Sequence, residues 1–302
     1  MPLEFGRGGG AAQITIDRER CTVCGLCVQV CSGAPLLIAD GVVCVDQSRL
    51  FGCIGCGQCV AVCPQGCISV TGRDLSPDDY LELPPQTARA DFDHLYALLL
   101  ARRSSRNFQD REVEAKLVER ILTAASTAPM GLPPSEVGVL VLPTRQKVKA
   151  FRDDLLQVVR PWRKWLTPFT LGLLRPFIGK DNYDGFKQFI LPALTAYVEQ
   201  DDAGTDWFFY DAPLALYFYG SRFADPADVY IAATYAMVAG QALGLGTCML
   251  GFTGYIMQYS ARTRQKYHLP KKIQPGLAVI FGYPAVKYRQ ALRRRFADVR
   301  FT

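Results

Sequence analysis

Residues 21–31 read CTVCGLCVQVC and residues 53–63 read CIGCGQCVAVC, with cysteines at the same relative positions. Each run has the pattern C-x2-C-x2-C-x3-C, and the two runs are 32 residues apart. This regular spacing indicates an internal duplication. Ten of the eleven cysteines fall within residues 21–67, which argues against a disulfide framework spread along a secreted chain. The pattern therefore decides the fold of the N-terminal part of the protein.

Cysteines at this spacing are typical ligands of [4Fe-4S] clusters. Three thiolates surround one cluster, and the fourth, three residues further on, reaches the neighbouring cluster. A pair of zinc sites is the alternative, but zinc ribbons use two separated C-x2-C pairs rather than triplets. The predicted ligands are Cys21, Cys24, Cys27 and Cys63 for cluster one, and Cys53, Cys56, Cys59 and Cys31 for cluster two.

Residues 14–71 resemble the bacterial two-cluster ferredoxins, with Ser32 where that family usually has proline after the first run. Cys44 and Cys67 lack the spacing of ligands, so we interpret both as small buried hydrophobic side chains. The resemblance implies a domain that moves single electrons and has no substrate pocket of its own. We therefore expect the remaining residues to hold a second redox centre.

The rest of the chain predicts an α+β fold in a second domain. Residues 76–91 are polar and contain prolines, so they are interpreted as a linker between domains at 1–75 and 92–302. A helical insertion is expected at 147–210. Its aromatic residues could shape a site for a large apolar substrate, but core packing is the favoured interpretation for most of Trp162, Trp165, Phe169, Tyr183 and Phe186. Helices are predicted at 92–104, 112–126 and 225–246, the last ending in a glycine-rich turn, and strands at 138–142, 213–220 and 276–284.

Two groups of arginines stand out in this second domain. The stretch ARRSSRNF, residues 101–108, places three arginines and two serines at the end of a predicted helix, and these groups suit a phosphate monoester. The alternative is a solvated basic helix end. Residues 288–299 hold a second group of arginines. The alternative interpretation of this group is a basic run on the protein surface. His94 and His268 are isolated, and Cys248 has no evident base partner, so none of them indicates a catalytic role.

Several motifs in order resemble the nitroreductase family of FMN flavoproteins. The resemblance covers residues 86–302 apart from the insertion. One departure is MGLPPSEV at 130–137, where the family usually has SGxNxQPW, so that Pro133 and Val137 occupy its asparagine and tryptophan positions. The motifs are RRS-x-R-x-F (102–108), VERILTAASTAP (118–129), DAPLALYFYG (211–220), AGQALGLGTCMLGF (239–252) and IFGYPAVKY (280–288).

The resemblance implies a mainly antiparallel sheet flanked by helices, bound FMN, and a homodimer whose interface builds the flavin site. The flavin N5 would carry the chemistry, so no catalytic side chain is predicted. The implied FMN contacts are Arg102, Arg103, Ser104 and Arg106 at the phosphate and ribityl chain, Arg294 or Arg295 at the phosphate, Leu250 and Gly251 near the isoalloxazine, and Pro129, Met130 and Gly131 in a loop from the partner subunit.

Together the two parts indicate an iron–sulfur flavoprotein oxidoreductase. Two [4Fe-4S] clusters would pass electrons to FMN and on to an organic acceptor, in a nitroreductase-type reduction. The electron donor would be a ferredoxin-type protein or NAD(P)H. The alternative from a different class is a non-catalytic electron carrier or redox sensor that binds a partner protein.

Charge and hydropathy limit the partners and the compartment. The formal charge of +6 would be largely offset by two clusters and a flavin phosphate, so nucleic-acid binding is not indicated. The uncharged run at 229–261 contains five glycines, which favours a buried helix and a turn over a membrane span. Residues 165–178 are too short to span a membrane and suit a lid or an interfacial helix. The N-terminal residues lack the apolar segment of a signal peptide, so we expect a cytoplasmic protein.

Overall fold

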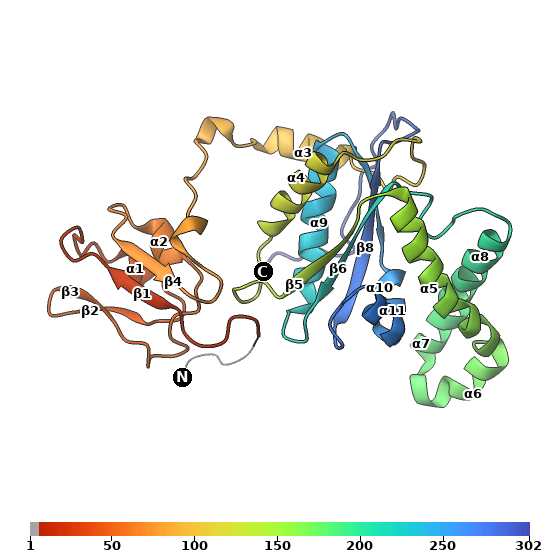
Figure 1. Cartoon of the computed structure of the whole chain (residues 1–302), viewed down its shortest axis with the longest axis horizontal. Helices are drawn as coiled ribbons and strands as arrows, with labels where there is room; N and C mark the ends of the chain where they lie inside the picture. Colours follow the sequence, from red (N-terminus) through yellow and green to blue (C-terminus); the bar gives the residue numbers. More distant parts are fainter. Residues whose placement is uncertain (1–5) are drawn as a thin grey trace. The chain divides into compact units, whose positions relative to one another are not determined.

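The computed structural model describes residues 6–302 and divides into two compact units (Figure 1). The first five residues, on which the signal-peptide prediction partly rests, lie outside the described part. Two loops of the second predicted domain belong to the first unit. The sequence does not indicate this. The first unit comprises residues up to Arg89 with Pro129–Val137 and Gly220–Asp228, and the second comprises Ala90–Ala128, Gly138–Tyr219 and Val229–Thr302.

The first unit is built from two small antiparallel sheets and two short helices. In one sheet Ile14 pairs with Val70, and in the other Leu37 pairs with Cys44. Buried cysteines share the core with aliphatic side chains such as Leu36 and Val70. The elements are β1 (Gln13–Ile16), α1 (Leu26–Gln29), β2 (Leu36–Ala39), β3 (Val42–Val45), α2 (Gln58–Val62) and β4 (Ile68–Thr71).

The two helices of this unit begin in the same way, as the duplication requires. Gly25 precedes α1 with φ 78°, and Gly57 precedes α2 with φ 71°. Residues with a side chain rarely adopt this left-handed conformation, so glycine is needed where each cysteine loop turns into its helix.

The predicted linker begins against the first unit. Short helical turns form at η1 (Pro77–Asp79) and η2 (Gln86–Ala88). The Tyr80 hydroxyl donates to the carbonyl of Val70 and accepts from its amide, both at 2.8 Å. Residues 76–80 are therefore held on β4 rather than forming a free connection.

The second unit is a four-stranded sheet covered by helices on both faces. The strand order is β5-β6-β8-β7, and β7 pairs antiparallel with β8. Helices α4 and α9 lie on one side of the sheet and α5 and α10 on the other (Figure 1). The strands are β5 (Val137–Leu142), β6 (Leu214–Gly220), β7 (Gly246–Leu250) and β8 (Gln274–Gly282). The helices are α3 (Phe92–Ala101), α4 (Ala115–Ser126), α5 (Arg145–Trp165), α6 (Pro168–Ile178), α7 (Lys180–Gly185), η3 (Phe186–Ile190), α8 (Leu191–Asp202), α9 (Pro226–Ala242), α10 (Phe252–Tyr259) and α11 (Ala261–Lys266).

The glycine-rich segment at 243–251 is not only a turn, as the sequence predicts, but also contains β7. Gly244 ends the preceding helix with φ 78°, and the chain then pairs with β8 from Gly246 to Leu250. Pairing with a buried strand overrides the weak β-propensity of glycine. Among the described residues, no helix combines the length and apolar content that crossing a membrane requires.

The insertion at 147–210 is helical, but only part of it lies in the core. On α5, Val148, Phe151 and Leu155 are buried, and the Phe151 ring lies 6.0 Å from the Tyr217 ring of β6. Further along, Trp165 is 75% exposed and Phe169 is 76% exposed, so the prediction that most of these aromatic residues pack in the core is wrong. The amphipathic α5 buries one face, and α8 adds Leu194 and Val198 to the same core, whereas Trp165 and Phe169 lie outside it.

Candidate functional site

Eight cysteines of the first unit gather around two cavities. The two groups exchange the last cysteine of each run, so Cys63 joins the first run and Cys31 joins the second. This grouping supports the ligand assignment from the repeat spacing, although the ligand role itself stays a prediction. One cavity is lined by Cys21, Cys24, Cys27 and Cys63, and the other by Cys31, Cys53, Cys56 and Cys59.

The thiols within each group influence one another strongly. Burial raises the pKa of Cys59 to about 12, and the nearby Cys53 and Cys56 add to the rise. Burial likewise raises the pKa of Cys27, with Cys24 contributing. Among the described residues, no group of three potential ligands is arranged to hold a single metal ion. The thiols instead line a cavity. A cluster that binds thiolates would therefore release protons as it is taken up.

A fifth cysteine lines the first cavity. Cys67 is buried and its Sγ lies 3.4 Å from the Sγ of Cys63. The burial of Cys67 agrees with its interpretation as a small buried side chain, but its place beside Cys63 was not predicted, because its spacing matches no ligand pattern. Cys44, the other surplus cysteine, is absent from the lining of both described cavities.

Arg73 is a buried cation beside the second cavity. Its guanidinium donates to the carbonyls of Ile54 at 3.0 Å, Gly10 at 2.9 Å and Pro133 at 2.8 Å. The charge of Arg73 also acts on the Cys53 thiol, where it opposes the rise in pKa that burial causes. Arg73 therefore joins the loop of the second cysteine run to the loop at 129–137, and no motif in the sequence marks it.

In the second unit, the arginines of the RRS-x-R-x-F motif lie beside β7. The Ser105 amide donates to the Thr247 carbonyl at 2.9 Å, which aligns the motif with the strand. Burial lowers the pKa of Arg102, and the charges of Arg294 and Arg103 lower it further. Of the arginines in the C-terminal segment, Arg294 is therefore the one whose charge acts on Arg102 of the motif.

This arginine group lacks a compensating carboxylate. In the part of the chain that the structure describes, no acidic side chain forms an ion pair with Arg102, Arg103, Arg106 or Arg294. Burial raises the pKa of the adjacent Cys248, whereas Arg106 and Ser104 oppose that rise. A cation such as Arg102, which is partly buried without a carboxylate partner in the described residues, is costly, so the group suits a bound polyanion such as a phosphate monoester.

The other predicted contacts are distributed around the fold. Leu250 ends β7 and Gly251 lies between β7 and α10, on the same segment as Cys248. Arg295 is exposed in the tail, with no described interaction to the arginine group. Pro129, Met130 and Gly131 belong to the first unit, where the Gly131 amide donates to the buried Asp228 carboxylate at 3.0 Å.

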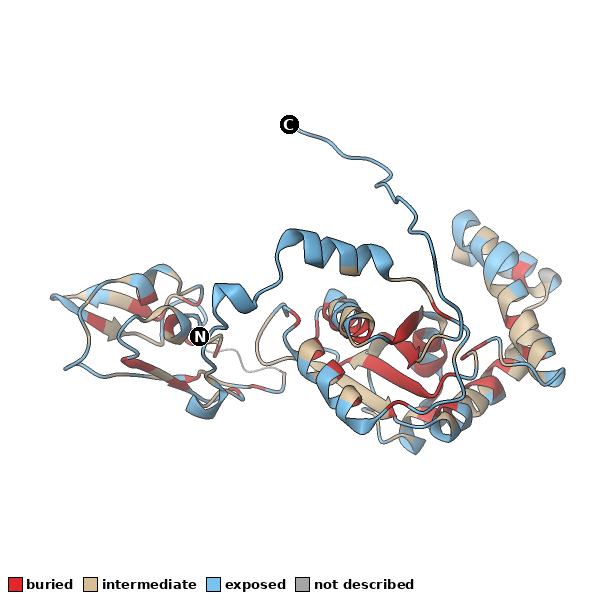
Figure 2. Cartoon of the chain, turned by 90° about the horizontal axis from the view of Figure 1, so that it is seen from above, coloured by how far each residue is buried: buried red, intermediate tan, exposed pale blue. Residues whose placement is uncertain are grey.

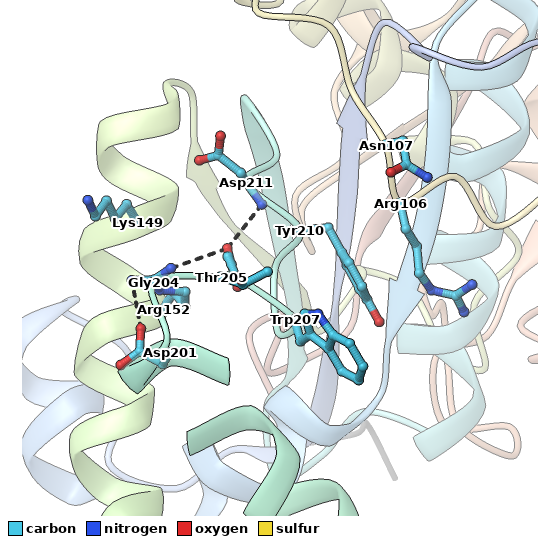
Figure 3. A pocket seen from close by; sticks show the side chains of 11 residues that line it. Arg106, Asn107, Lys149, Arg152, Asp201, Gly204, Thr205, Trp207, Tyr210 and Asp211 are labelled. Atoms are coloured by element: carbon cyan, nitrogen blue, oxygen red, sulfur yellow. Dashed lines mark hydrogen bonds and ion pairs between the residues drawn. The ribbon is translucent and has the colours of Figure 1, made fainter. Parts of the chain in front are cut away.

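A cleft of about 780 Å³ opens beside Arg106. Its walls come from the 106–107 segment, α5 and the loop after α8. Tyr210 and Trp207 lie on the side that faces Arg106, and the Arg106 guanidinium carbon is 5.6 Å from the Tyr210 ring centre (Figure 3). On the opposite wall Arg152 pairs with Asp201 at 3.2 Å. The cleft thus offers aromatic faces and a cation to a small ligand.

Comparison with known families and structures agrees with this architecture. The family model described as "Nitroreductase family" matches residues 99–283, and the model described as "4Fe-4S dicluster domain" matches residues 13–64. No curated protein matches the chain.

Solved structures resemble about two thirds of the chain. An FMN-bound nitroreductase from Bacteroides fragilis NCTC 9343 is 16% identical, with TM-score 0.51, over 69% of this chain and 97% of that one. An FMN-bound nitroreductase from Desulfitobacterium hafniense DCB-2 is 16% identical, with TM-score 0.49, over 68% of this chain and 98% of that one. The first likeness shows a shared fold.

We expect inorganic phosphate to stabilise the protein once bound small molecules are removed, because an anion would neutralise the arginine group. At a phosphate concentration 100 times its Kd, the free energy of unfolding should rise by about 2.7 kcal/mol. Urea unfolding with and without phosphate measures this. Arg102→Gln should lose most of the gain, whereas Arg120→Gln on the exposed face of α4 should keep it. An equal gain in both variants would contradict the assignment.

Proposed function

Because the chain belongs to the nitroreductase family and carries a 4Fe-4S dicluster domain, we propose that it passes electrons from two [4Fe-4S] clusters to FMN and on to an organic acceptor. The observation that carries the proposal is the presence, in one chain, of two cysteine-lined cavities and an arginine group without an acidic partner. When bound, FMN supplies two-electron hydride chemistry at N5. The side chains bind and orient it.

The arginine group is the proposed anchor for the FMN phosphate. Arg102 and Arg294 act on each other electrostatically, and both would gain from sharing one phosphate. Ser104 and Arg106 lie beside Cys248 on β7, where hydroxyl and guanidinium donors suit the ribityl chain. Leu250 ends that strand, Gly251 follows it, and both would lie against the ring.

Cluster two is the proposed exit toward the flavin. Arg73 holds the loop of the second cysteine run and the Pro133 carbonyl together, and the loop of Pro133 continues directly into β5. The resemblance to the family implies that the start of this loop, Pro129–Gly131, would lie against flavin in a homodimer. Electrons would enter at cluster one, from a ferredoxin-type donor or from NAD(P)H, and leave through cluster two.

The cleft beside Arg106 is the proposed site for the acceptor. Trp207 and Tyr210 present flat apolar faces, and Arg106 presents a positive charge beside them. A planar, electron-poor organic molecule with an anionic or nitro-type substituent fits this combination.

A homodimer is supported by apolar side chains that the single chain leaves exposed. On α3, Phe92 is 74% exposed, and Leu95, Tyr96 and Leu99 continue the same exposed face. The C-terminal residues are also exposed and include Phe296 and Phe301 (Figure 2). Apolar surfaces of this kind mark interfaces.

To test the relay, Cys56→Ser is compared with the wild type and with Cys44→Ser, a cysteine outside both cavities. Anaerobic protein should contain about eight irons and one FMN per chain. Reduced ferredoxin should bleach the flavin in stopped flow for the wild type and Cys44→Ser, but at least about 100-fold more slowly for Cys56→Ser, because loss of cluster two breaks the path.

Unchanged bleaching in Cys56→Ser would exclude the relay. Bleaching by NADH that is equally fast in all three proteins would make the nicotinamide the direct donor of the flavin. Eight irons without flavin, even after FMN is added, would favour the alternative of a non-catalytic electron carrier or redox sensor.

Arg73→Gln should lower the reduction potential of cluster two, because it removes a buried positive charge beside Cys53. A change on the order of 59 mV corresponds to tenfold in a one-electron equilibrium, and we expect a shift of that order. An EPR-monitored redox titration measures it, with cluster one as the internal reference. Arg89→Gln, in the linker, should leave both potentials unchanged. Equal shifts of both clusters would contradict this role for Arg73.

Leu99→Asp should dissociate the dimer and release FMN, because it places a charge on the exposed apolar face of α3. Sedimentation equilibrium and flavin fluorescence in the filtrate measure the two effects. Leu173→Asp, on α6 and also exposed, is the matched control and should remain dimeric with its flavin. A dimeric Leu99→Asp protein that keeps its FMN would rule out this interface.

A further inference from the structure

We propose that Cys67 is a fifth thiol of the cluster-one site and can replace Cys63 as an iron ligand. This inference rests on the proposed cluster ligation and goes beyond it, because a two-cluster site needs eight cysteines and this unit places nine around its two cavities. The ninth has a position that a ligand could use.

The geometry brings the two sulfur atoms to the same corner of the cavity. The Sγ atoms of Cys63 and Cys67 are 3.4 Å apart, and the Cys67 amide lies 3.5 Å from the Cys63 Sγ. Cys67 also acts electrostatically on Cys21, another ligand of this cavity. A sulfur that lies this close to a predicted ligand and lines the same cavity is placed to bind the same iron after a change of side-chain rotamer.

The backbone holds Cys67 firmly in this place. A turn after Cys63 is closed by the Gly66 amide, which donates to the Cys63 carbonyl at 3.2 Å. The Cys67 carbonyl accepts from the Asp17 amide at 2.8 Å, and β4 begins at the next residue. The thiol is therefore positioned by a turn and a strand rather than by a loose loop.

The duplication supplies an internal comparison. In the other repeat the Ala34 amide donates to the Cys31 carbonyl at 3.3 Å, which is the same turn, and β2 begins at Leu36. The residue equivalent to Cys67 is Pro35, and Pro35 lines the second cavity. The two sites share this turn but differ at the residue that follows it: the cluster-one cavity has an additional thiol there, whereas the cluster-two cavity has a proline.

The proposed exchange is balanced and needs no oxidant. Cys67 gives its thiol proton to the Cys63 sulfur as that sulfur leaves the iron, and the Cys67 thiolate then forms the new Fe–S bond. One Fe–S bond breaks and one forms, the proton moves between the two cysteines, and the oxidation state of the iron is unchanged. Cluster one would therefore survive loss of the Cys63 ligand, whereas cluster two would not survive loss of Cys31.

The test compares ligand deletions in the full-length protein, purified anaerobically. Cys63→Ala should keep about eight irons per chain and the EPR signals of both reduced clusters. Cys63→Ala combined with Cys67→Ala should lose the cluster-one signal. Cys31→Ala, the matched deletion in the other repeat, should lose the cluster-two signal. Cys31→Ala combined with Pro35→Cys should recover it, because the added thiol reproduces the arrangement of the first site.

Loss of the cluster-one signal in Cys63→Ala, to the same extent as in the double variant, would overturn the proposal. If Cys63→Ala does not fold, the wild type and Cys67→Ala give the answer, because both keep all eight predicted ligands. Iron release to a chelator should be several-fold faster from cluster one of Cys67→Ala, and release from cluster two should be unchanged. Equal release rates from cluster one in both proteins would overturn the proposal.

This experiment is separable from the proposed enzyme function. Iron content and EPR report cluster retention without any flavin or acceptor. A wild type that lacks eight irons would refute the clusters themselves, whereas a wild type with eight irons and an unstable Cys63→Ala would refute only the role of Cys67.

Discussion

The packing of thiols around two cavities is the constraint on which the first unit depends. The unit is small, and buried cysteines occupy places where a larger domain would have aliphatic side chains. Each cavity takes three cysteines from one run and one from the other, so the two repeats must stand side by side. The short helices α1 and α2, the turns that precede them and the pairing of β1 with β4 all follow from this crossed arrangement. A domain of this kind gains much of its stability from what the thiols bind.

The site of the second unit depends on a group of arginines that has no described acidic partner. Its sheet and the buried face of α5 supply an ordinary apolar core, which holds β7 in place. Against β7 lie several guanidinium groups and a buried thiol, with no described acidic partner. Such a group raises the energy of the empty protein and lowers that of the protein with a bound anion. The same strand that orders the arginines ends at Leu250, so one element would position both ends of a phosphate-bearing cofactor.

The two kinds of site are connected through the chain itself. The loops at 129–137 and 220–228 arise from the sheet of the second unit and fold with the first. Asp228 holds Gly131, and Arg73 holds Pro133 together with the second cysteine run. The MGLPPSEV sequence, which departs from the pattern usual in the family, therefore makes contacts with residues that a flavoprotein without a cluster domain would lack.

The sequence by itself determined the features that depend on spacing along the chain. The cysteine runs predicted which cysteines share each cavity, because three of the four come from one closely spaced run and the repeat supplies the fourth. Helical and strand periodicity predicted α4, α5, β5, β6 and β8, because each pattern repeats over a few residues. The family match confirmed the resemblance that the ordered motifs carried. Only the tertiary structure decided the contributions from distant residues. It brought Arg294 to Arg102, buried Arg73 between three segments, left Trp165 exposed and placed Cys67 beside Cys63. These contacts depend on which surfaces meet after folding, and local spacing along the chain does not encode them. Cys67 and its counterpart Pro35 follow the same turn in the two repeats, yet only one of them brings a thiol to its cavity.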